Sequence, residues 1–103
     1  MKQAYLIAYD ITDNRFRTKM ADQLISIGME RVQWSVFMGT VKIKKINDFS
    51  LWFQKESVTF ASSDKDSLLI LNVSVNQLSQ IRVFGPKFID IEMLTDNKLT
   101  LII

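Results

Sequence analysis

The chain has 103 residues, a hydrophobic fraction of 48% and a formal net charge of only +2, which indicate one folded domain and argue against a disordered chain. Cysteine and histidine are absent, so disulfides and imidazole catalysis are excluded, and a metal site would need oxygen ligands and a hard cation such as Mg²⁺, or Mn²⁺ in its place. No apolar run approaches the length of a membrane span and the start lacks a signal-peptide pattern, so a cytoplasmic protein without membrane contact is expected.

The first 28 residues are predicted to form a strand followed by a helix. Residues 4–10 are largely apolar on both faces, which is typical of a central strand covered on both sides. Asp13 is expected to be the N-cap of a helix over residues 14–27, whose apolar side chains recur at helical spacing. Gly28 is expected to end this helix in a left-handed conformation.

Residues 31–41 are predicted to be extended, with a bend or bulge near Gly39, and residues 43–57 to form a second helix. Strict alternation would give the extended segment two faces. One face would carry Val32, Trp34, Val36 and Met38, and the other Arg31, Gln33, Ser35 and Phe37. The second face is either an ordinary solvent-facing surface or the lining of an interface or a phosphate path.

The second half of the chain is predicted to consist mainly of strands. Residues 58–66 are polar and turn-like, and residues 68–75 form the clearest strand in the chain. Strand character is also present over residues 81–84, 88–94 and 99–103. The order of these elements predicts an α+β fold in which a helix pair packs on a mostly antiparallel sheet.

Asp10 lies at the C-terminal end of the first predicted strand and is a candidate metal ligand. A strand-end aspartate more often caps a turn or a helix, and one carboxylate alone makes a poor metal site. If the sheet dimerised about a two-fold axis near Asp10, however, two copies of this carboxylate would converge. Two carboxylates can hold one Mg²⁺ ion and its waters against a phosphodiester.

Arg15, Arg17 and Lys19 open the first predicted helix, where the partial positive charge of a helix N-terminus makes cations unfavourable. Departures from a local rule are often functional, and cations beside free helix N–H groups can bind phosphate. Neutralisation by Asp13 and Asp22 on a solvated face is the alternative explanation. A second basic cluster before the second helix is either a solvated surface or a contact to nucleic-acid backbone: Lys42, Lys44 and Lys45.

Four segments, in order and at the expected spacing, resemble the CRISPR-associated protein two family. Residues 5–11 look like the family's opening strand with its apolar-Tyr-Asp-Ile ending, and residues 15–19 are similar to the basic helix that follows it. Residues 28–37 closely match the family's most specific signature, which runs Gly, two residues, Arg, apolar, Gln, any residue, Ser, Val, Phe. Residues 64–71 are similar to the acidic-Ser start of the family's later strand.

The resemblance implies a ferredoxin-like βαββαβ sandwich that forms a homodimer, with residues 1–85 as the core and residues 86–103 as a C-terminal strand extension. That extension would pair with the other protomer or with an integrase. Asp10 matches the family's Mg²⁺ ligand near the dimer axis, and Ser35 matches a supporting residue of the same site. The candidate nucleic-acid contacts are Arg15, Arg17, Lys19, Arg31 and Lys42.

The resemblance also implies a role in CRISPR spacer acquisition. Family members bridge two dimers of the CRISPR integrase and hold duplex DNA, and they are described as metal-dependent endonucleases on RNA or duplex DNA. Single-stranded RNA and duplex DNA are therefore both expected partners. Two alternatives stay open, namely a structural adaptor without catalysis and a toxin-type endoribonuclease of the related virulence-associated family.

Overall fold

The computed structural model describes residues 1–60 and 64–86. Within this part the elements follow the order β1, α1, β2, β3, α2, β4 and α3. Their bounds are β1 Lys2–Asp10, α1 Asn14–Ser26, β2 Glu30–Gln33, β3 Val36–Lys42, α2 Ile43–Thr59, β4 Ser67–Val73 and α3 Val75–Leu78. The first six elements form the expected βαββαβ sequence, which confirms the predicted α+β fold.

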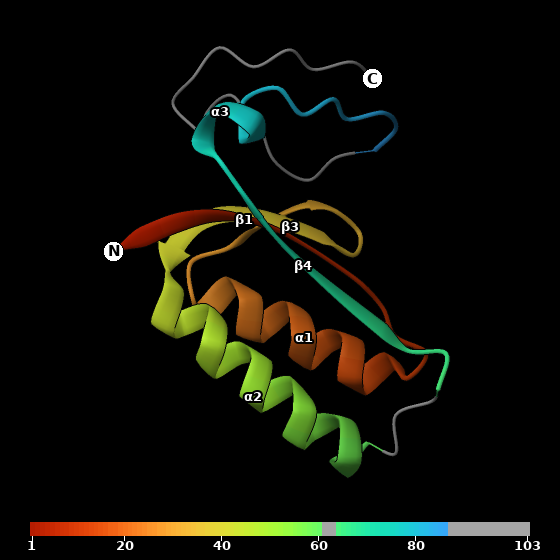
Figure 1. Cartoon of the computed structure of the whole chain (residues 1–103). Coiled ribbons are helices and arrows are strands. Elements are labelled where there is room, and N and C mark those ends of the chain that lie inside the picture. Colours follow the sequence, from red (N-terminus) through yellow and green to blue (C-terminus); the bar gives the residue numbers. More distant parts are fainter. Residues whose placement is uncertain (61–63, 87–103) are drawn as a thin grey trace.

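The strands form one antiparallel sheet in the order β2-β3-β1-β4, with β1 in the interior as its two apolar faces predict (Figure 1). The register pairs Lys2 with Lys42 at one end of β1, and Asp10 with Ser67 of β4 at the other. The outer edge of β4 has no neighbouring strand within the described residues. The end of β1 that carries Asp10 is the end at which β4 begins.

Helices α1 and α2 lie side by side under one face of the sheet (Figure 1). Tyr5, Ile7 and Tyr9 of β1 point into this helix-covered core. Phe16 of α1 is fully buried there among the aromatic rings of α2 and the residue that follows it. Its ring centroid lies 5.1 Å from that of Phe60, 5.7 Å from that of Phe53 and 6.3 Å from that of Trp52.

The opposite face of the sheet is covered only in part, by the segment that follows β4 (Figure 1). A small second core forms there from Ala4, Val32, Met38, Leu78 and Val83. We call the rest of this side the open face, and it runs toward the Asp10 end of β1. The register gives it Ala8 of β1 beside Leu69 of β4, and the pair Leu6 and Leu71 lies where it borders the second core.

Both predicted ends of α1 are confirmed. The Asp13 carboxylate accepts hydrogen bonds from the backbone N–H groups of Arg15 at 2.8 Å and Phe16 at 3.0 Å, which is the geometry of an N-cap. Gly28 has a φ of +103°, a conformation that a residue with a β-carbon rarely adopts. The backbone can therefore leave α1 and enter β2 within a few residues.

Residues 31–41 do not form one extended segment with a bend near Gly39, and the two strands that the βαββαβ topology requires are present instead. They form β2 and β3, joined by a turn at Trp34 and Ser35. Gly39 instead lies inside β3, where an added β-carbon would come within 3.1 Å of the Met29 sulfur and 3.2 Å of the Gly28 carbonyl oxygen. This glycine permits close packing of β3 against the chain that leaves α1, and it makes no bend.

The turn also breaks the predicted alternation of faces. Trp34 was expected to share a face with Val32, but Val32 is buried and Trp34 is exposed. Phe37 and Met38 are both fully buried, because Phe37 enters the helix-covered core and Met38 the second core. Because β3 is covered on both faces here, its sequence does not alternate between polar and apolar residues.

Two further predictions in the second half need correction. Residues 81–84 form no strand, and the chain takes the short helix α3 directly after β4. A capping box starts that helix, with the Ser74 hydroxyl and the Gln77 side chain each bonded to the other residue's backbone N–H. The strands expected over residues 88–94 and 99–103 lie outside the described residues. In the described ranges, no helix is long and apolar enough to cross a membrane.

Candidate functional site

Asp10 is exposed at the C-terminal end of β1, as the sequence predicts. Alternation along β1 places its side chain on the same side of the sheet as Ala4 and Leu6, away from the two helices. Its strand partner is Ser67, the first residue of β4. The carboxylate therefore stands at one end of the open face, within reach of solvent and of another molecule.

The oxygen chemistry of this carboxylate suits a hard cation such as Mg²⁺. Across residues 1–60 and 64–86, however, no group of three or more acidic side chains is close enough to hold a metal ion. A cation at Asp10 would need further oxygen ligands from water, backbone or a second copy of the chain. The exposed position of Asp10 leaves room for all three.

The cations that open α1 are arranged around Asp13 and Phe60. Arg15 forms an exposed ion pair with Asp13 at 3.3 Å, and its guanidinium carbon lies 5.5 Å from the centroid of the Phe60 ring. The Lys19 ammonium lies at the same distance of 5.5 Å from that ring. The neutralisation expected from Asp13 is therefore present for Arg15, and the cation–π contacts orient both side chains without removing their charges.

Asp13 itself has a lowered pKa. Hydrogen bonds from the Phe16 backbone N–H and the Arg15 side chain hold the pKa of its carboxyl below the ordinary value of 3.8. It is therefore an anion at neutral pH. This fixed negative charge stabilises the start of α1, where the helix dipole is positive and three cations follow.

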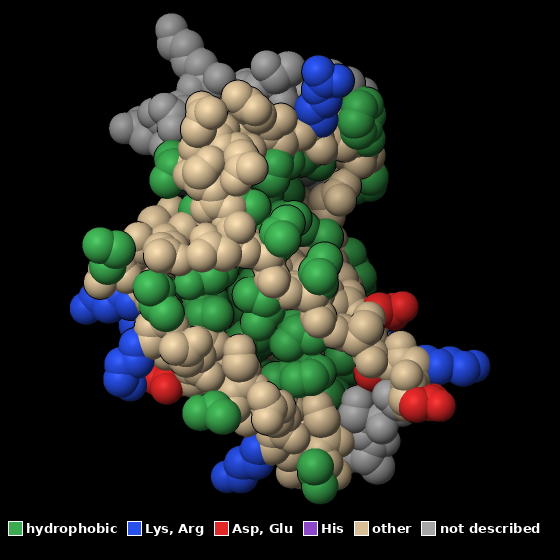
Figure 2. Space-filling model, viewed as in Figure 1, with side chains coloured by type: hydrophobic (Ala, Val, Ile, Leu, Met, Phe, Trp, Pro, Cys, Tyr) green, Lys and Arg blue, Asp and Glu red, His purple; other side chains and the backbone are tan. Residues whose placement is uncertain are grey.

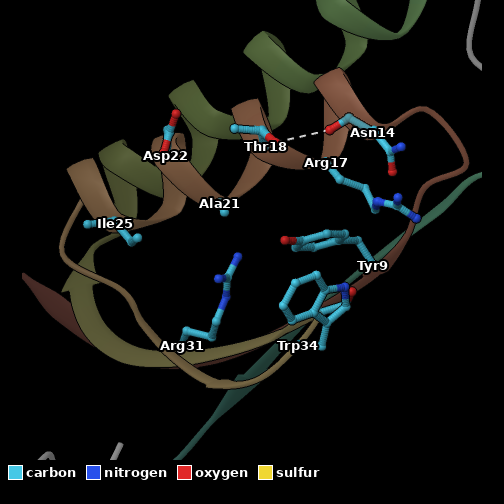
Figure 3. A pocket seen from close by; sticks show the side chains of 10 residues that line it. Tyr9, Asn14, Arg17, Thr18, Ala21, Asp22, Ile25, Arg31 and Trp34 are labelled. Carbon is cyan, nitrogen blue, oxygen red and sulfur yellow. Dashed lines mark hydrogen bonds between the residues drawn. The ribbon is translucent and has the colours of Figure 1, made fainter. Parts of the chain in front are cut away.

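A pocket of about 360 Å³ lies between α1 and the turn that joins β2 to β3 (Figure 3). We call it the α1 pocket. Helix α1 forms its upper wall in the view of Figure 3, and the lower wall comes from the sheet and the turn. Its lining residues are Tyr9, Asn14, Arg17, Thr18, Ala21, Asp22, Ile25, Arg31, Trp34 and Ser35.

Tyr9 and Arg31 form the floor of the α1 pocket. The Tyr9 ring stacks on Phe37 at 6.1 Å and its hydroxyl points into the pocket, and Arg31 rises beside it toward α1 (Figure 3). The guanidinium carbon of Arg31 lies 5.2 Å from the Phe37 ring centroid and 5.5 Å from that of Trp34. These ring contacts fix the direction of the guanidinium.

Burial raises the pKa of the Tyr9 hydroxyl above 10.0, and a hydrogen bond and the charge of Arg31, with the charge of Arg17, offset part of that rise. The Tyr9 hydroxyl is consequently protonated at neutral pH and can donate a hydrogen bond. Arg17 stands at the rim of the pocket and donates one hydrogen bond to the Ile11 carbonyl at 3.3 Å. The pocket therefore holds two permanent cations and a neutral phenol.

The structure brings most of the predicted site residues to one end of the sheet, on two different sides. Arg17, Arg31 and Ser35 line the α1 pocket on the helix side, whereas Asp10 lies on the open face. The Ser35 carbonyl accepts a hydrogen bond from the Tyr9 backbone N–H at 3.1 Å, which places Ser35 beside the strand end that carries Asp10.

Lys42 is the exception. It pairs with Lys2 at the start of β1, and the eight residue steps to Asp10 span roughly 26 Å along the strand. Lys42 lines a different hollow there, together with Lys2 and Lys45.

The loop after β1 is tied to the loop before β4. The backbone N–H and the hydroxyl of Thr12 both donate to one carboxylate oxygen of Asp66, each at 2.9 Å. This double hydrogen bond links residues 54 positions apart in the chain. It positions the start of α1, and thus Arg15 and Arg17, relative to the sheet.

Sequence reasoning missed the roles of Tyr9 and Trp34. Tyr9 was treated only as an apolar strand residue, and Trp34 was placed on one face of an extended segment with Val32, Val36 and Met38. Trp34 precedes Ser35 in a turn without glycine or proline, so the sequence carries no strong turn signal there. A usable signal was the run Val36-Phe37-Met38, which is too apolar for a strand with a solvent-facing side.

Comparison with known proteins identifies relatives of this fold. The family model described as CRISPR associated protein Cas2 matches residues 3–81. A protein of Synechocystis sp. named CRISPR-associated endoribonuclease Cas2 3 is 42% identical over 81 residues, which are 79% of this chain and 83% of the relative. One of Francisella tularensis subsp. novicida, named CRISPR-associated endoribonuclease Cas2 1, is 36% identical over 85 residues, 82% of each chain.

A solved structure also matches. The crystal structure of a hypothetical protein from Thermus thermophilus superposes with a TM-score of 0.64 at 32% sequence identity. The match covers 86% of this chain and 98% of the other. The family model spans the sheet, both long helices and α3, and so includes β1, α1 and the β2–β3 turn, which build the α1 pocket.

Proposed function

The chain belongs to the CRISPR associated protein Cas2 family, and from this premise we propose that it is a metal-dependent endonuclease of CRISPR spacer acquisition that acts as a homodimer. The observation that carries the proposal is the position of Asp10, an exposed carboxylate at the end of the central strand. Two relatives that align over about four fifths of the chain are named endoribonucleases, which supports nuclease chemistry.

The open face supports the homodimer. Leu69 of β4 is 57% exposed and Leu71 is 46% exposed, and both flank β1 on the side away from the helices. Figure 2, which views the molecule from the β4 edge of the sheet, shows hydrophobic side chains on both sides of this edge and charged ones mainly toward the periphery. An uncovered strand edge bearing leucines favours association with another chain. A second copy on this face brings a second Asp10 toward the first.

Such a pair of carboxylates would hold Mg²⁺, which supplies a water of lowered pKa and neutralises charge on a phosphodiester. The remaining roles belong to the chain's own side chains. Asp10 of each protomer would hold the Mg²⁺ ion. Arg15, Arg17 and Lys19 at the start of α1 would bind the phosphates of the nucleic-acid strand. Ser35, beside the end of β1, supports the geometry of that strand end.

The basic start of α1 also supports the binding of duplex DNA between two integrase dimers. Arg15 and Lys19 keep their positive charges at the surface, and the Thr12–Asp66 hydrogen bonds hold this helix start in place. Cations fixed on a helix end bind phosphates without reading sequence. A dimer would present two such helix starts, as a protein that holds the middle of a duplex requires.

The decisive experiment compares the wild-type protein with Asp10→Asn, which keeps the size of the side chain and removes its charge. Each protein is incubated with single-stranded RNA and with duplex DNA, in Mg²⁺ or in chelator. We expect cleavage by the wild type only with metal, and a loss of about a hundredfold or more in Asp10→Asn, as removal of several kcal/mol of transition-state stabilisation requires.

Asp48→Asn is the matched control, because Asp48 is an exposed carboxylate of α2 that pairs with Lys44 at 2.9 Å, away from the end of β1. It should cleave like the wild type. Equal cleavage by Asp10→Asn and the wild type, or cleavage that persists in chelator, would overturn the proposal. No cleavage by any of these proteins would favour the adaptor without catalysis.

A further inference from the structure

We propose that the α1 pocket binds one unpaired nucleotide of a single-stranded nucleic acid, with its base stacked on Trp34 and its phosphate held by Arg17. This inference rests on the proposed function, since it names the substrate class of the same protein. It concerns the helix side of the sheet and involves neither Asp10 nor a metal. The pocket can therefore be tested by binding alone.

The size and shape of the α1 pocket suit a single nucleotide. Its volume of about 360 Å³ lies in the range of small-molecule sites and is far too small for a base pair with both backbones. Ala21 stands above the middle of the pocket in Figure 3, and its methyl group leaves open the space that a longer side chain would fill. Asn14 and Thr18 lie further along the same wall, near Arg17.

Trp34 provides a stacking surface. Its side chain is 67% exposed at the turn between β2 and β3, which is unusual for a tryptophan in a small domain. The guanidinium carbon of Arg31 lies 5.5 Å from the centroid of the Trp34 ring, and this contact limits the movement of the indole. Proteins that bind single strands use exposed aromatic rings of this kind, because every base has a flat face to stack. The other tryptophan, Trp52, is half-buried in the aromatic core.

The opposite charges of Arg17 and Asp22, at different ends of the pocket, orient the bound nucleotide. A guanidinium carries five N–H donors, and Arg17 donates one of them to the Ile11 carbonyl, so further donors can meet a phosphate at this rim. Asp22 lies toward the other end of the pocket in Figure 3, where its carboxylate would repel a phosphate. The Tyr9 hydroxyl projects between these two ends and can donate to the sugar or the base.

A single strand fits this arrangement and a duplex does not. In a duplex each base is stacked and paired, so a base reaches an indole at a pocket mouth only after it leaves the helix. A duplex would still meet the surface cations of α1 through its backbone, without using Trp34. Dependence of binding on Trp34 therefore separates the two classes of nucleic acid.

The test uses the full chain with Trp52→Phe, which leaves Trp34 as the one remaining tryptophan of the two in the sequence. A ten-nucleotide RNA without self-complementarity, DNA of the same sequence and the corresponding duplex are titrated in chelator, so that no cleavage occurs. We expect a single strand, of RNA or of DNA, to quench Trp34 fluorescence in a saturable way. The separate RNA and DNA titrations show which sugar the pocket prefers.

Affinities are then measured for Trp34→Leu by a label on the nucleic acid. We expect single-strand binding to weaken about tenfold, as loss of one stacking contact predicts, and duplex binding to change less than about twofold. Trp34→Phe should keep most of the affinity. The matched control is Phe84→Leu, because Phe84 is a 60% exposed aromatic residue that does not line the pocket, and it should bind like the wild type.

Equal affinity of wild type and Trp34→Leu for single strands would overturn the inference, and so would equal losses for single strands and duplex. Circular dichroism shows that each variant is folded, which is expected because Trp34 and Phe84 are exposed and Trp52→Phe keeps an aromatic ring in the core. A protein that binds single strands through Trp34 but cleaves nothing would overturn the proposed nuclease and leave the pocket intact. Cleavage that depends on Asp10, together with single-strand binding that is unchanged in Trp34→Leu, would support the proposed nuclease and overturn the role of the pocket.

Discussion

Asp13 joins the folding of α1 to the charges of the candidate site. Its carboxylate caps the helix through the Arg15 and Phe16 N–H groups and also pairs with the Arg15 side chain. Because these partners favour the charged form, the carboxyl pKa in the folded protein is lower than the ordinary value of 3.8. The stabilisation is therefore present above pH 3.8 and is lost as the pH falls through the lower pKa of the folded state.

We predict that Asp13→Ala lowers the melting temperature at pH 7, and that its difference from the wild type shrinks as the pH falls below 3.8. Asp13→Ser is the control, because a serine hydroxyl can cap the helix but does not titrate. It should restore part of the melting temperature, independently of pH. The measurement is thermal unfolding followed by circular dichroism from pH 3 to pH 7. A difference between wild type and Asp13→Ala that stays constant over this range would contradict the role of the charge.

Residues whose roles depend on near neighbours in sequence could be predicted. Asp13 and Gly28 have the expected roles, because a cap needs only the next few backbone groups and a left-handed turn needs only the absence of a β-carbon. Gly39 could not be assigned correctly. The reason for a glycine there is the close approach of Met29, and this contact exists only after β3 packs against the chain that leaves α1.

At the scale of elements, the aromatic contacts of Phe16 hold α1 against α2 and so fix where the cations of α1 stand. We predict that Phe16→Ala lowers the free energy of unfolding by about 3–5 kcal/mol, the usual cost of removing a fully buried aromatic ring. The measurement is urea denaturation followed by circular dichroism. Because the Phe60 ring contacts both Phe16 and the cations, nucleic-acid binding should weaken as well in the fraction that stays folded.

Leu51→Ala provides the comparison, because Leu51 lies on α2 but is 65% exposed. Its removal should change the free energy of unfolding by less than about 0.5 kcal/mol. Similar losses in Phe16→Ala and Leu51→Ala would show that the aromatic core does not hold the helix pair together.

The existence of β1, both long helices and β4 could be predicted from periodicity, since each shows a clear apolar pattern over many residues. The turn of the β2–β3 hairpin could not be placed from periodicity, because it uses Trp34 and Ser35, which are not typical turn residues. Residues 81–84 resemble a strand locally, yet Val83 instead packs over the sheet in the second core. Tertiary packing there overrides the local preference for a strand.

For the molecule as a whole, the two sides of the sheet carry different candidate sites. The helix side carries the α1 pocket with Trp34 and Arg17, whereas the open face carries Asp10 and the leucines of β4. These two sides of the sheet meet at the C-terminal end of β1, so a nucleic-acid strand that crosses this end could contact both sides. Asp10 could be chosen as a candidate from the sequence, because it lies at the end of the first predicted strand and within the family's apolar-Tyr-Asp-Ile pattern. The pocket could not be predicted, because residues from β1, α1 and the β2–β3 turn become neighbours only in the fold.

The proposed homodimer would use the open face, and it gives the last prediction. We expect the wild-type protein to have twice the mass of one chain in sedimentation equilibrium, and the double change Leu69→Lys with Leu71→Lys to shift it to the mass of one chain. Two lysines on the open face would place like charges from both copies close together and would remove apolar contact area. Because both leucines are at least 46% exposed in one chain, the variant should remain folded by circular dichroism.

Leu51→Lys adds the same kind of charge on an exposed position of α2 and should leave the dimer intact. If catalysis needs an Asp10 from each protomer, the Leu69 and Leu71 variant should also lose metal-dependent cleavage while its monomer still binds a single strand through Trp34. A variant that stays dimeric would place the interface elsewhere. A monomer that cleaves at the wild-type rate would show that one Asp10 is sufficient, and would separate the nuclease from the dimer.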